Sequence, residues 1–409
     1  MRFDPVSNPY TPGAGQAPPL LTGRDDELAR FDATLSRLTR GRPAQCPLVV
    51  GLRGVGKTVL LNEFARRAVA RDWVVVDHEL TATGDLFATT TRLVRDAVLQ
   101  VAPPGAWRAA GQRVGALLRS IEVSYELAGL SVGVARSEEA DARASMDMAR
   151  DLTELLVSLG EAARDHGRGV ALLFDELQFA STAPLGALVT ALHKVAQREL
   201  PVTLVAAGLP QTRGVLAEAA SYAERMFAPV EVGPLSDADA KRALAEPAER
   251  EGVQYDEGAL LRAVAFTEGY PYFLQVFGDH VWRYAAGTPV AAEDAERIAP
   301  LVRDSLDRGF FVFRTDRLPV AQRRYLRAMA ELRGSEVSSG DIATQLGMRS
   351  SAQAGQTRDA LIRKGLIYSP RLGRAAFTVP QFDDYLRRHF ELERHEPRAR
   401  RPSDAARDR

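Results

Sequence analysis

Short apolar runs alternate along the first half of the chain with longer segments in which apolar residues recur every three or four positions. The continuous runs, typical of strands buried on both faces of a parallel sheet, are 46–50, 73–77, 169–174, 202–208 and 230–232. The intervening segments have the helical period, as in 28–38, where Leu28, Phe31, Leu35 and Leu38 share one face. This alternation predicts an α/β domain over 20–233, a three-layer fold with a parallel sheet of five strands and helices on both faces.

The pattern changes at three further places. Residues 120–135 alternate between apolar and polar positions, which predicts a β-hairpin inserted in the α/β domain. Residues 234–310 have no strand pattern, and the helix starts at Ser236 and Pro271 predict a helical lid. Three helical segments and two strands then predict a winged helix-turn-helix over 311–394, in which 350–364 is the recognition helix.

The two ends of the chain have the composition of unstructured segments. Residues 1–19 contain five prolines and few apolar residues, so we expect a disordered leader. Residues 395–409 are rich in charge, and we expect a disordered tail.

The segment Gly51–Thr58 has the sequence GLRGVGKT and fits the pattern G-x-x-x-x-G-K-[ST] between a predicted strand and a predicted helix. Its glycines allow backbone N–H groups to point at phosphate oxygens, and the following helix presents its positive end to the same anion. We expect Lys57 to reach the outer phosphates and the Thr58 hydroxyl to hold Mg²⁺. The expected nucleotide-binding residues are Gly51, Arg53, Gly54, Val55, Gly56, Lys57, Thr58 and Val59. The sequence therefore predicts a nucleoside triphosphate site.

The third apolar strand ends in two carboxylates, Asp175 and Glu176. In a phosphate-loop enzyme, Asp175 would hold the metal through its water shell and Glu176 would polarise the attacking water. A buried strand whose acidic end only caps the next turn is the alternative interpretation. Because the phosphate loop lies upstream, we expect hydrolysis, with Lys57 and Glu176 as catalytic residues.

Composition narrows the class of protein further. The chain has 409 residues and a single cysteine, Cys46, which cannot form a disulfide framework. No apolar run approaches the roughly 18 residues of a membrane span, and the N-terminus has no signal-peptide core. We therefore expect a cytoplasmic protein without membrane contact. The net charge is zero, but residues 301–409 contain 22 Lys and Arg against 14 Asp and Glu, which favours a polyanionic partner.

The predicted winged helix is a candidate for binding double-stranded DNA. We expect early residues of the recognition helix to face base edges and arginines of the hairpin to meet phosphates. The candidates are Ser351, Gln353, Gln356, Arg358, Arg371 and Arg374. A winged helix that binds a protein partner is the alternative, and the local positive charge favours DNA.

Together these motifs resemble the AAA-type ATPases of the ORC/Cdc6 initiator kind and the related archaeal-type ATPases of the STAND group. Gly51–Thr58 matches Walker A, Leu172–Glu176 matches Walker B, and Gly23-Arg24 with Glu27 matches a G-R-x-x-E box that lies near the adenine. The resemblance implies an ATPase that binds ATP and Mg²⁺, with Arg24 beside the nucleotide. Arg225 matches the position of an arginine finger that reaches a neighbouring subunit's nucleotide, which implies a homo-oligomer; a surface arginine at a helix end is the alternative.

The sequence departs from the family pattern at two places. The fourth strand ends in Ala207-Gly208, where the sensor-1 residue is usually Asn, Ser or Thr, and Gln211 or Thr212 are candidates to replace it. The lid has no sensor-2 arginine, and Gly269-Tyr270-Pro271 is instead similar to the G-x-P segment of STAND ATPases. These departures imply slow hydrolysis and a molecular switch that reports nucleotide state to the winged helix. The alternative is an ATP-regulated scaffold that binds a protein.

Overall fold

The computed structural model describes residues 3–13, 15–101 and 138–391, without the side chains of 138–144. The predicted β-hairpin at 120–135 and the predicted tail at 395–409 lie outside the described residues. The chain divides into two compact units, 1–300 and 301–409. The first unit contains both the predicted ATPase domain and most of the predicted lid.

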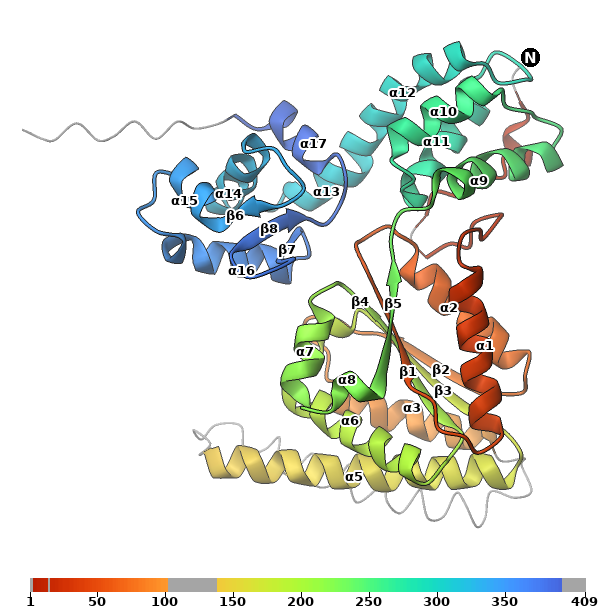
Figure 1. Ribbon diagram of the computed structural model, residues 1–409, viewed down its shortest axis with the longest axis vertical. Helices are drawn as coiled ribbons and strands as arrows, with labels where there is room; N and C mark the ends of the chain where they lie inside the picture. Colours follow the sequence, from red (N-terminus) through yellow and green to blue (C-terminus); the bar gives the residue numbers. More distant parts are fainter. Residues whose placement is uncertain (1–2, 14, 102–137, 392–409) are drawn as a thin grey trace, which may run out of the picture. The chain divides into compact units, whose positions relative to one another are not determined.

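The first unit is built on a five-stranded parallel sheet in the order β2-β3-β4-β1-β5 (Figure 1). The strands are β1 (Cys46–Gly51), β2 (Val74–Glu79), β3 (Val170–Asp175), β4 (Val202–Gly208) and β5 (Phe227–Val232). Every residue of β1, β3 and β4 is buried, which explains why these strands are continuous apolar runs. The predicted fold and the existence of all five strands are confirmed.

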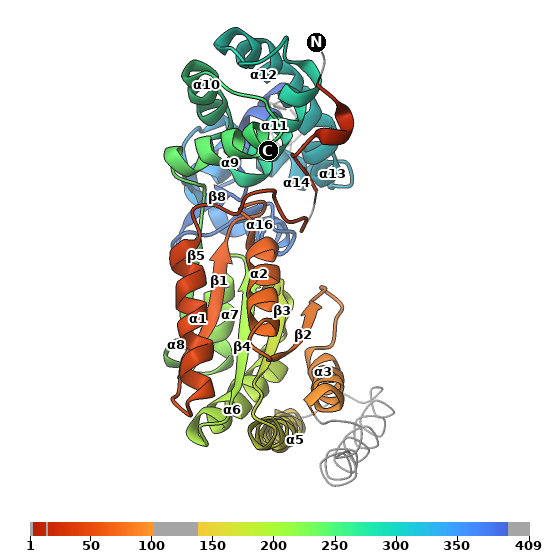
Figure 2. The ribbon, with the colours of Figure 1, turned by 90° about the vertical axis from the view of Figure 1, so that its right-hand side faces the viewer.

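Helices cover both faces of this sheet (Figures 1 and 2). On one face lie α1 (Asp25–Thr39) and α2 (Lys57–Val69), and α1 buries the four apolar side chains that the sequence predicts. On the other face lie α3 (Leu86–Val101), α5 (Glu138–Asp165) and α6 (Thr182–Gln197), which share a hydrophobic core with the sheet. The connections after β3 and β4 contain η2 (Leu177–Phe179), α7 (Thr212–Ala219) and α8 (Ala223–Met226).

A helical region follows the sheet, with α9 (Asp237–Arg250), α10 (Glu257–Thr267), α11 (Pro271–Tyr284) and α12 (Ala292–Leu306). The Ser236 side chain caps α9 by accepting the N–H of Asp239 at 3.1 Å, as its spacing predicts. Pro271 is the first residue of α11, where its missing N–H costs nothing. The predicted helix starts are therefore confirmed.

The prediction of a disordered leader is wrong for the described part of residues 1–19. Tyr10 is 3% exposed, and its hydroxyl donates to the Leu244 carbonyl at 2.6 Å. The indole of Trp282 donates to the Asp4 carbonyl at 2.7 Å. The segment, which includes η1 (Pro5–Ser7), is thus held against α9 and α11 by a few specific contacts. Average composition does not reveal such contacts, which is why the proline-rich segment was predicted to be disordered.

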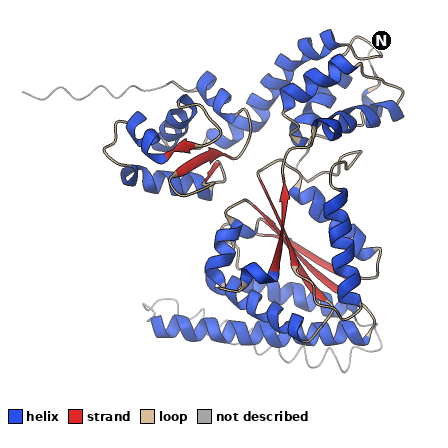
Figure 3. Cartoon of the chain, in the orientation of Figure 1, coloured by secondary structure: helices blue, strands red, loops and turns tan. Residues whose placement is uncertain are grey.

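The second unit has the helix and strand order of a winged helix (Figure 3). After η3 (Asp307–Phe311) and α13 (Val312–Thr315) come α14 (Val320–Glu331), β6 (Val337–Ser338), α15 (Ser339–Gln345), η4 (Ser351–Ala354), α16 (Gly355–Arg363), β7 (Ile367–Tyr368), β8 (Arg374–Phe377) and α17 (Phe382–His389). The strands form an antiparallel sheet in the order β6-β8-β7. The predicted winged-helix arrangement is confirmed.

Two details of this unit differ from prediction. The two-residue strand β6 was missed, because two residues are too few to show an alternating pattern. The predicted helix 350–364 begins as the 3₁₀ turn η4, and α-helical geometry starts only at Gly355. Ser and Gly are weak helix formers, which explains a tight first turn at this end. Among the described helices of both units, none has the length and apolar composition needed to cross a bilayer.

Candidate functional site

The phosphate loop joins the carboxyl end of β1 to the first turn of α2. Gly54 and Gly56 have φ angles of 84° and 92°, a left-handed conformation that favours glycine. A Cβ on Gly54 would also lie only 2.8 Å from the Tyr270 ring. The local backbone and a distant aromatic residue therefore both require glycine at the tip of this loop. The predicted residues Gly51, Arg53, Val55 and Val59 lie in the same loop and helix start.

Lys57, the first residue of α2, folds back over the loop. Its ammonium group donates to the Leu52 carbonyl at 2.9 Å, and the side chain is buried. Burial lowers the pKa of Lys57, while the nearby carboxylates of Glu176 and Asp175 oppose that shift. The lysine is thus a desolvated cation that a phosphate oxygen can attract away from a neutral carbonyl.

The two predicted magnesium ligands contact each other. Thr58 Oγ1 donates to Asp175 Oδ2 at 2.5 Å, and Asp175 Oδ1 accepts the N–H of Glu176 at 2.8 Å. A hydroxyl and a carboxylate are the hard oxygen ligands that Mg²⁺ prefers, and Mg²⁺ usually takes its remaining ligands from phosphates and water. The residues present therefore fit the ion, and Glu176 follows directly on the same strand end.

Arg24 is buried against the phosphate loop. Its guanidinium donates to the carbonyls of Gly233 at 2.6 Å and Val55 at 3.4 Å. Burial lowers the pKa of Arg24, and the charges of Glu27 and Asp239 oppose this shift. The structure thus brings the predicted G-R-x-x-E arginine to the loop, about 30 residues away in sequence.

The start of α11 contacts the phosphate loop directly. The Tyr270 hydroxyl donates to the Arg53 carbonyl, and the Tyr272 N–H donates to the Gly54 carbonyl at 3.3 Å. Tyr270 is fully buried, and its ring packs against Gly54. The segment similar to a G-x-P motif therefore joins the helical region to the nucleotide loop through two hydrogen bonds.

Arg225 lies at the amino ends of the strands, opposite the end that carries the phosphate loop. It is the third residue of α8 and precedes β5, whose first residue Phe227 pairs with Cys46 at the start of β1. The phosphate loop follows the far end of β1, and six strand residues span about 20 Å. Arg225 therefore cannot reach the nucleotide site of its own chain, so any finger role requires a second subunit.

The predicted DNA-contacting residues lie on the second unit, most of them exposed. Ser351 and Gln353 are on η4, Gln356 and Arg358 on α16, and Arg371 and Arg374 on the wing. Arg371 forms an ion pair with Glu336 at 3.0 Å, and Arg358 with Asp359 at 3.2 Å. Gly347 has a φ of 70° and forms the predicted turn before η4.

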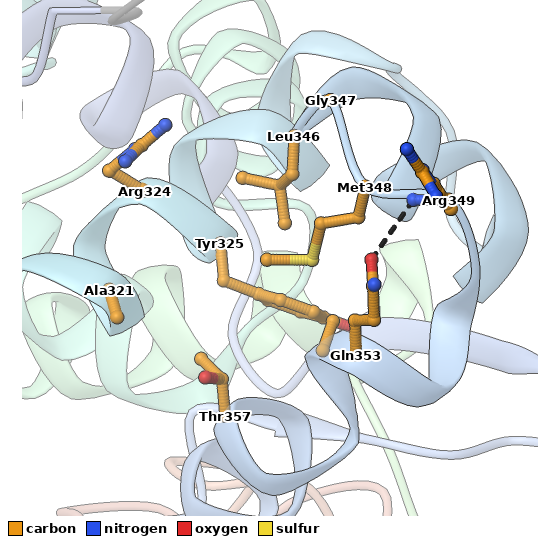
Figure 4. Close-up of a pocket in the computed structure, with 10 residues that line it drawn as sticks. Ala321, Arg324, Tyr325, Leu346, Gly347, Met348, Arg349, Gln353 and Thr357 are labelled. Carbon is orange, nitrogen blue, oxygen red and sulfur yellow. Dashed lines mark hydrogen bonds between the residues drawn. The ribbon is translucent and has the colours of Figure 1, made fainter. Parts of the chain in front are cut away.

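A pocket of about 420 Å³ lies beside these residues, between α14 and the turn that precedes η4 (Figure 4). Tyr325 and Met348 line it with apolar surface, and burial raises the pKa of Tyr325 to about 12. Gln353 also lines the pocket, and its Oε1 accepts the N–H of Arg349 at 3.0 Å (Figure 4). This bond uses one of the two acceptor positions of that oxygen.

Sequence reasoning missed two side chains at the nucleotide site. Gln178 contacts Glu176 and the end of β4. Tyr270 belongs to the segment similar to G-x-P, but the sequence does not predict the contact of its hydroxyl with the Arg53 carbonyl. A glutamine two positions after the acidic pair was the available signal for Gln178, but only the fold brings β4 beside it.

Comparison with known proteins agrees with this geometry. Residues 20–205 match the family described as AAA ATPase domain, and residues 308–386 match a domain of unknown function (DUF8462). The predicted resemblance to AAA-type P-loop ATPases is therefore confirmed for this part of the chain.

Several solved structures are similar to most of this chain. A Walker-type ATPase of Pyrococcus abyssi is similar over 90% of this chain and 96% of its own, with a TM-score of 0.54 and 16% identity. Cdc6p from Pyrobaculum aerophilum has a TM-score of 0.44 and 15% identity over 95% of this chain and 98% of its own. The Aeropyrum pernix ORC1 protein in complex with DNA has a TM-score of 0.43 and 17% identity over 90% of this chain and 93% of its own. At 16% identity, the similarity to the Pyrococcus abyssi ATPase concerns the fold alone.

Proposed function

We propose that this protein is an ATP-dependent molecular switch that binds and slowly hydrolyses ATP and reports nucleotide state to a DNA-binding winged helix. The observation that carries the ATPase part is the convergence of Lys57, Thr58, Asp175 and Glu176 at the carboxyl ends of β1 and β3. No other group of the described residues combines a phosphate loop with a carboxylate pair.

Each residue has a distinct task in this proposal. Lys57 exchanges the Leu52 carbonyl for a phosphate oxygen, and Thr58 and Asp175 hold Mg²⁺. Bound Mg²⁺ neutralises charge that develops on the phosphate oxygens. Glu176 orients the attacking water and accepts its proton.

The contacts at the start of α11 support a switch. Tyr270 and Tyr272 bind the carbonyls of Arg53 and Gly54, which belong to the loop that would close around phosphate. A change in the loop on nucleotide binding therefore alters the hydrogen bonds that hold α11. This gives nucleotide occupancy a direct physical route into the helical region.

The positive charge of residues 301–409 supports DNA as the partner of the winged helix. The wing carries Arg371 and Arg374, and neutralising phosphate charge makes affinity depend strongly on salt. We propose that these arginines contact the backbone and that Ser351, Gln353, Gln356 and Arg358 face the bases.

The ATPase part is tested with purified full-length chain, Lys57→Ala and Glu176→Gln. Lys57→Ala should abolish ATP binding in a calorimetric titration, since the buried cation is lost. Glu176→Gln should retain ATP binding and lower turnover on the order of 10²-fold. Unchanged affinity in the first variant, or surviving turnover in the second, would contradict the assigned roles.

The DNA part is tested by a salt titration of binding to duplex DNA, with and without ATP. Arg371→Ala and Arg374→Ala should each weaken binding and reduce the slope of log affinity against log salt by about 1. Arg308→Ala is the matched control, because this exposed arginine lies in the same unit on η3. If Arg308→Ala changes the slope as much as the wing variants do, DNA binding depends on the net charge of the unit and not on contacts made by the wing.

One observation favours the alternative of a protein-binding scaffold. Leu372 at the tip of the wing is fully exposed, with a relative accessibility of 102%, and its neighbour Arg371 is already paired with Glu336. An exposed leucine on a hairpin can anchor a protein partner in an apolar pocket. Absence of measurable affinity for duplex DNA at low salt would support the scaffold.

A further inference from the structure

Gln178 connects the carboxylate of Glu176 with the end of the fourth strand. It lies in η2, two residues after Glu176, and its Nε2 donates to Glu176 Oε2. Its Oε1 accepts the N–H of Leu209, the residue after β4, at 3.0 Å. A single amide side chain thus bridges the proposed general base and a neighbouring strand.

The strand end itself leaves room for this bridge. β4 ends in Ala207-Gly208, which offer no polar side chain. A Cβ on Gly208 would overlap the Thr212 hydroxyl and would lie 2.8 Å from Gln178 Oε1. Polar groups from η2 and α7 therefore occupy the space beside this glycine.

The same place contains an unused hydrogen-bonding group. Thr212 is completely buried, and its hydroxyl has no hydrogen-bond partner among the described residues. A buried hydroxyl without a hydrogen-bond partner destabilises a folded protein, so its presence calls for an explanation. A polar site at the end of β4 whose contacts change during the nucleotide cycle would account for it.

We propose that Gln178 is a positioning residue for Glu176 and replaces the polar residue that β4 lacks. This inference rests on the proposed ATPase function. Because the Leu209 N–H faces Gln178 Oε1, the amide can turn only its nitrogen toward Glu176. The donor holds the carboxylate in one orientation, and Glu176 itself starts from a left-handed backbone with φ of 55°. The orientation of the Glu176 side chain is therefore set both by its own backbone conformation and by the hydrogen bond from Gln178.

Two substitutions separate the two hydrogen bonds. Gln178→Met has a similar length but makes neither bond. Gln178→Glu can still accept from Leu209, but it replaces the donor with a second negative charge beside Glu176. Gln197→Met is the matched control, because Gln197 is exposed at the end of α6, remote from the site. The kcat and the KM for ATP are measured for each variant.

Both variants should lower kcat on the order of 10²-fold while KM for ATP changes less than about 3-fold, since misplacing a catalytic group by ~1 Å has this effect and the phosphate loop is untouched. Gln178→Glu keeps the bond to Leu209 but places a second negative charge beside Glu176, so its kcat should fall although the contact with the strand end remains.

The outcomes distinguish this inference from the proposed function. Normal kcat in both Gln178 variants, with turnover lost in Glu176→Gln, would overturn the positioning role alone. Turnover that survives Glu176→Gln would overturn the general-base role and the positioning role together. Loss of kcat in Gln178→Met together with an equal loss in Gln197→Met would show a general effect of the substitution and would also reject the inference.

Discussion

Replacing Tyr10 tests whether the first residues belong to the folded protein. Tyr10→Ala removes a ring that is 3% exposed and packs against α11, where a Cβ on Gly278 would overlap it. The ring also lies edge-on to Trp282, with 6.4 Å between centroids. Its hydroxyl bonds to the Leu244 carbonyl at 2.6 Å and to the Tyr255 hydroxyl at 2.8 Å.

These contacts set the expected magnitude. Removing a buried aromatic ring costs about 3–5 kcal/mol, so Tyr10→Ala should lower the free energy of unfolding by that amount. Tyr10→Phe keeps the ring and leaves the Leu244 carbonyl without its donor, which should cost about 1–3 kcal/mol. A tyrosine in a disordered leader would contribute close to zero in both variants.

The assay is urea unfolding of the full chain, combined with hydrogen exchange of peptides from residues 3–13. Tyr10→Ala should lower the unfolding midpoint and remove protection of the Tyr10 amide region. Val6→Ala is the matched control in the same segment, because Val6 is 92% exposed and should change neither quantity. An unfolding midpoint of Tyr10→Ala equal to that of Val6→Ala would refute the reasoning.

Three further measurements follow from the same structure. Tyr270→Phe should cost about 1 kcal/mol and weaken the ATP-dependent protection of α11 in hydrogen exchange, because the Arg53 carbonyl loses its donor; unchanged protection would contradict the proposed route to the lid. Gly208→Ala should destabilise the protein by about 1–3 kcal/mol and lower ATP turnover, since the new methyl group meets Thr212 and Gln178; wild-type turnover would argue against the tight packing. Burial raises the pKa of Tyr10 and of Tyr255 above 10 in the folded state. The free energy of unfolding should therefore be unaffected by these groups below pH 10 and should fall as the pH rises beyond it. Tyr10→Phe should flatten this alkaline decline in urea unfolding, and an equally steep decline would exclude the pair as its source.

The sequence by itself determined the features that lie in contiguous residues. The phosphate loop is eight consecutive residues between a strand and a helix, and its backbone angles follow from its own glycines. The buried strands are continuous apolar runs because both faces of a parallel sheet are covered. Helix starts at Ser236 and Pro271 depend on neighbouring backbone groups, so local sequence predicts them.

Only the tertiary structure decided the contacts between residues distant in sequence. Tyr10 meets α9 and α11 more than two hundred residues later, and composition averages hide one buried ring in a proline-rich segment. Gln178 gains its partner only because β4 is placed beside β3. Arg225 lies at the amino end of the sheet because β5 runs parallel to β1, which separates it from its own chain's phosphate loop. Local propensity acts over a few residues, whereas these positions depend on which strands pair and in which direction.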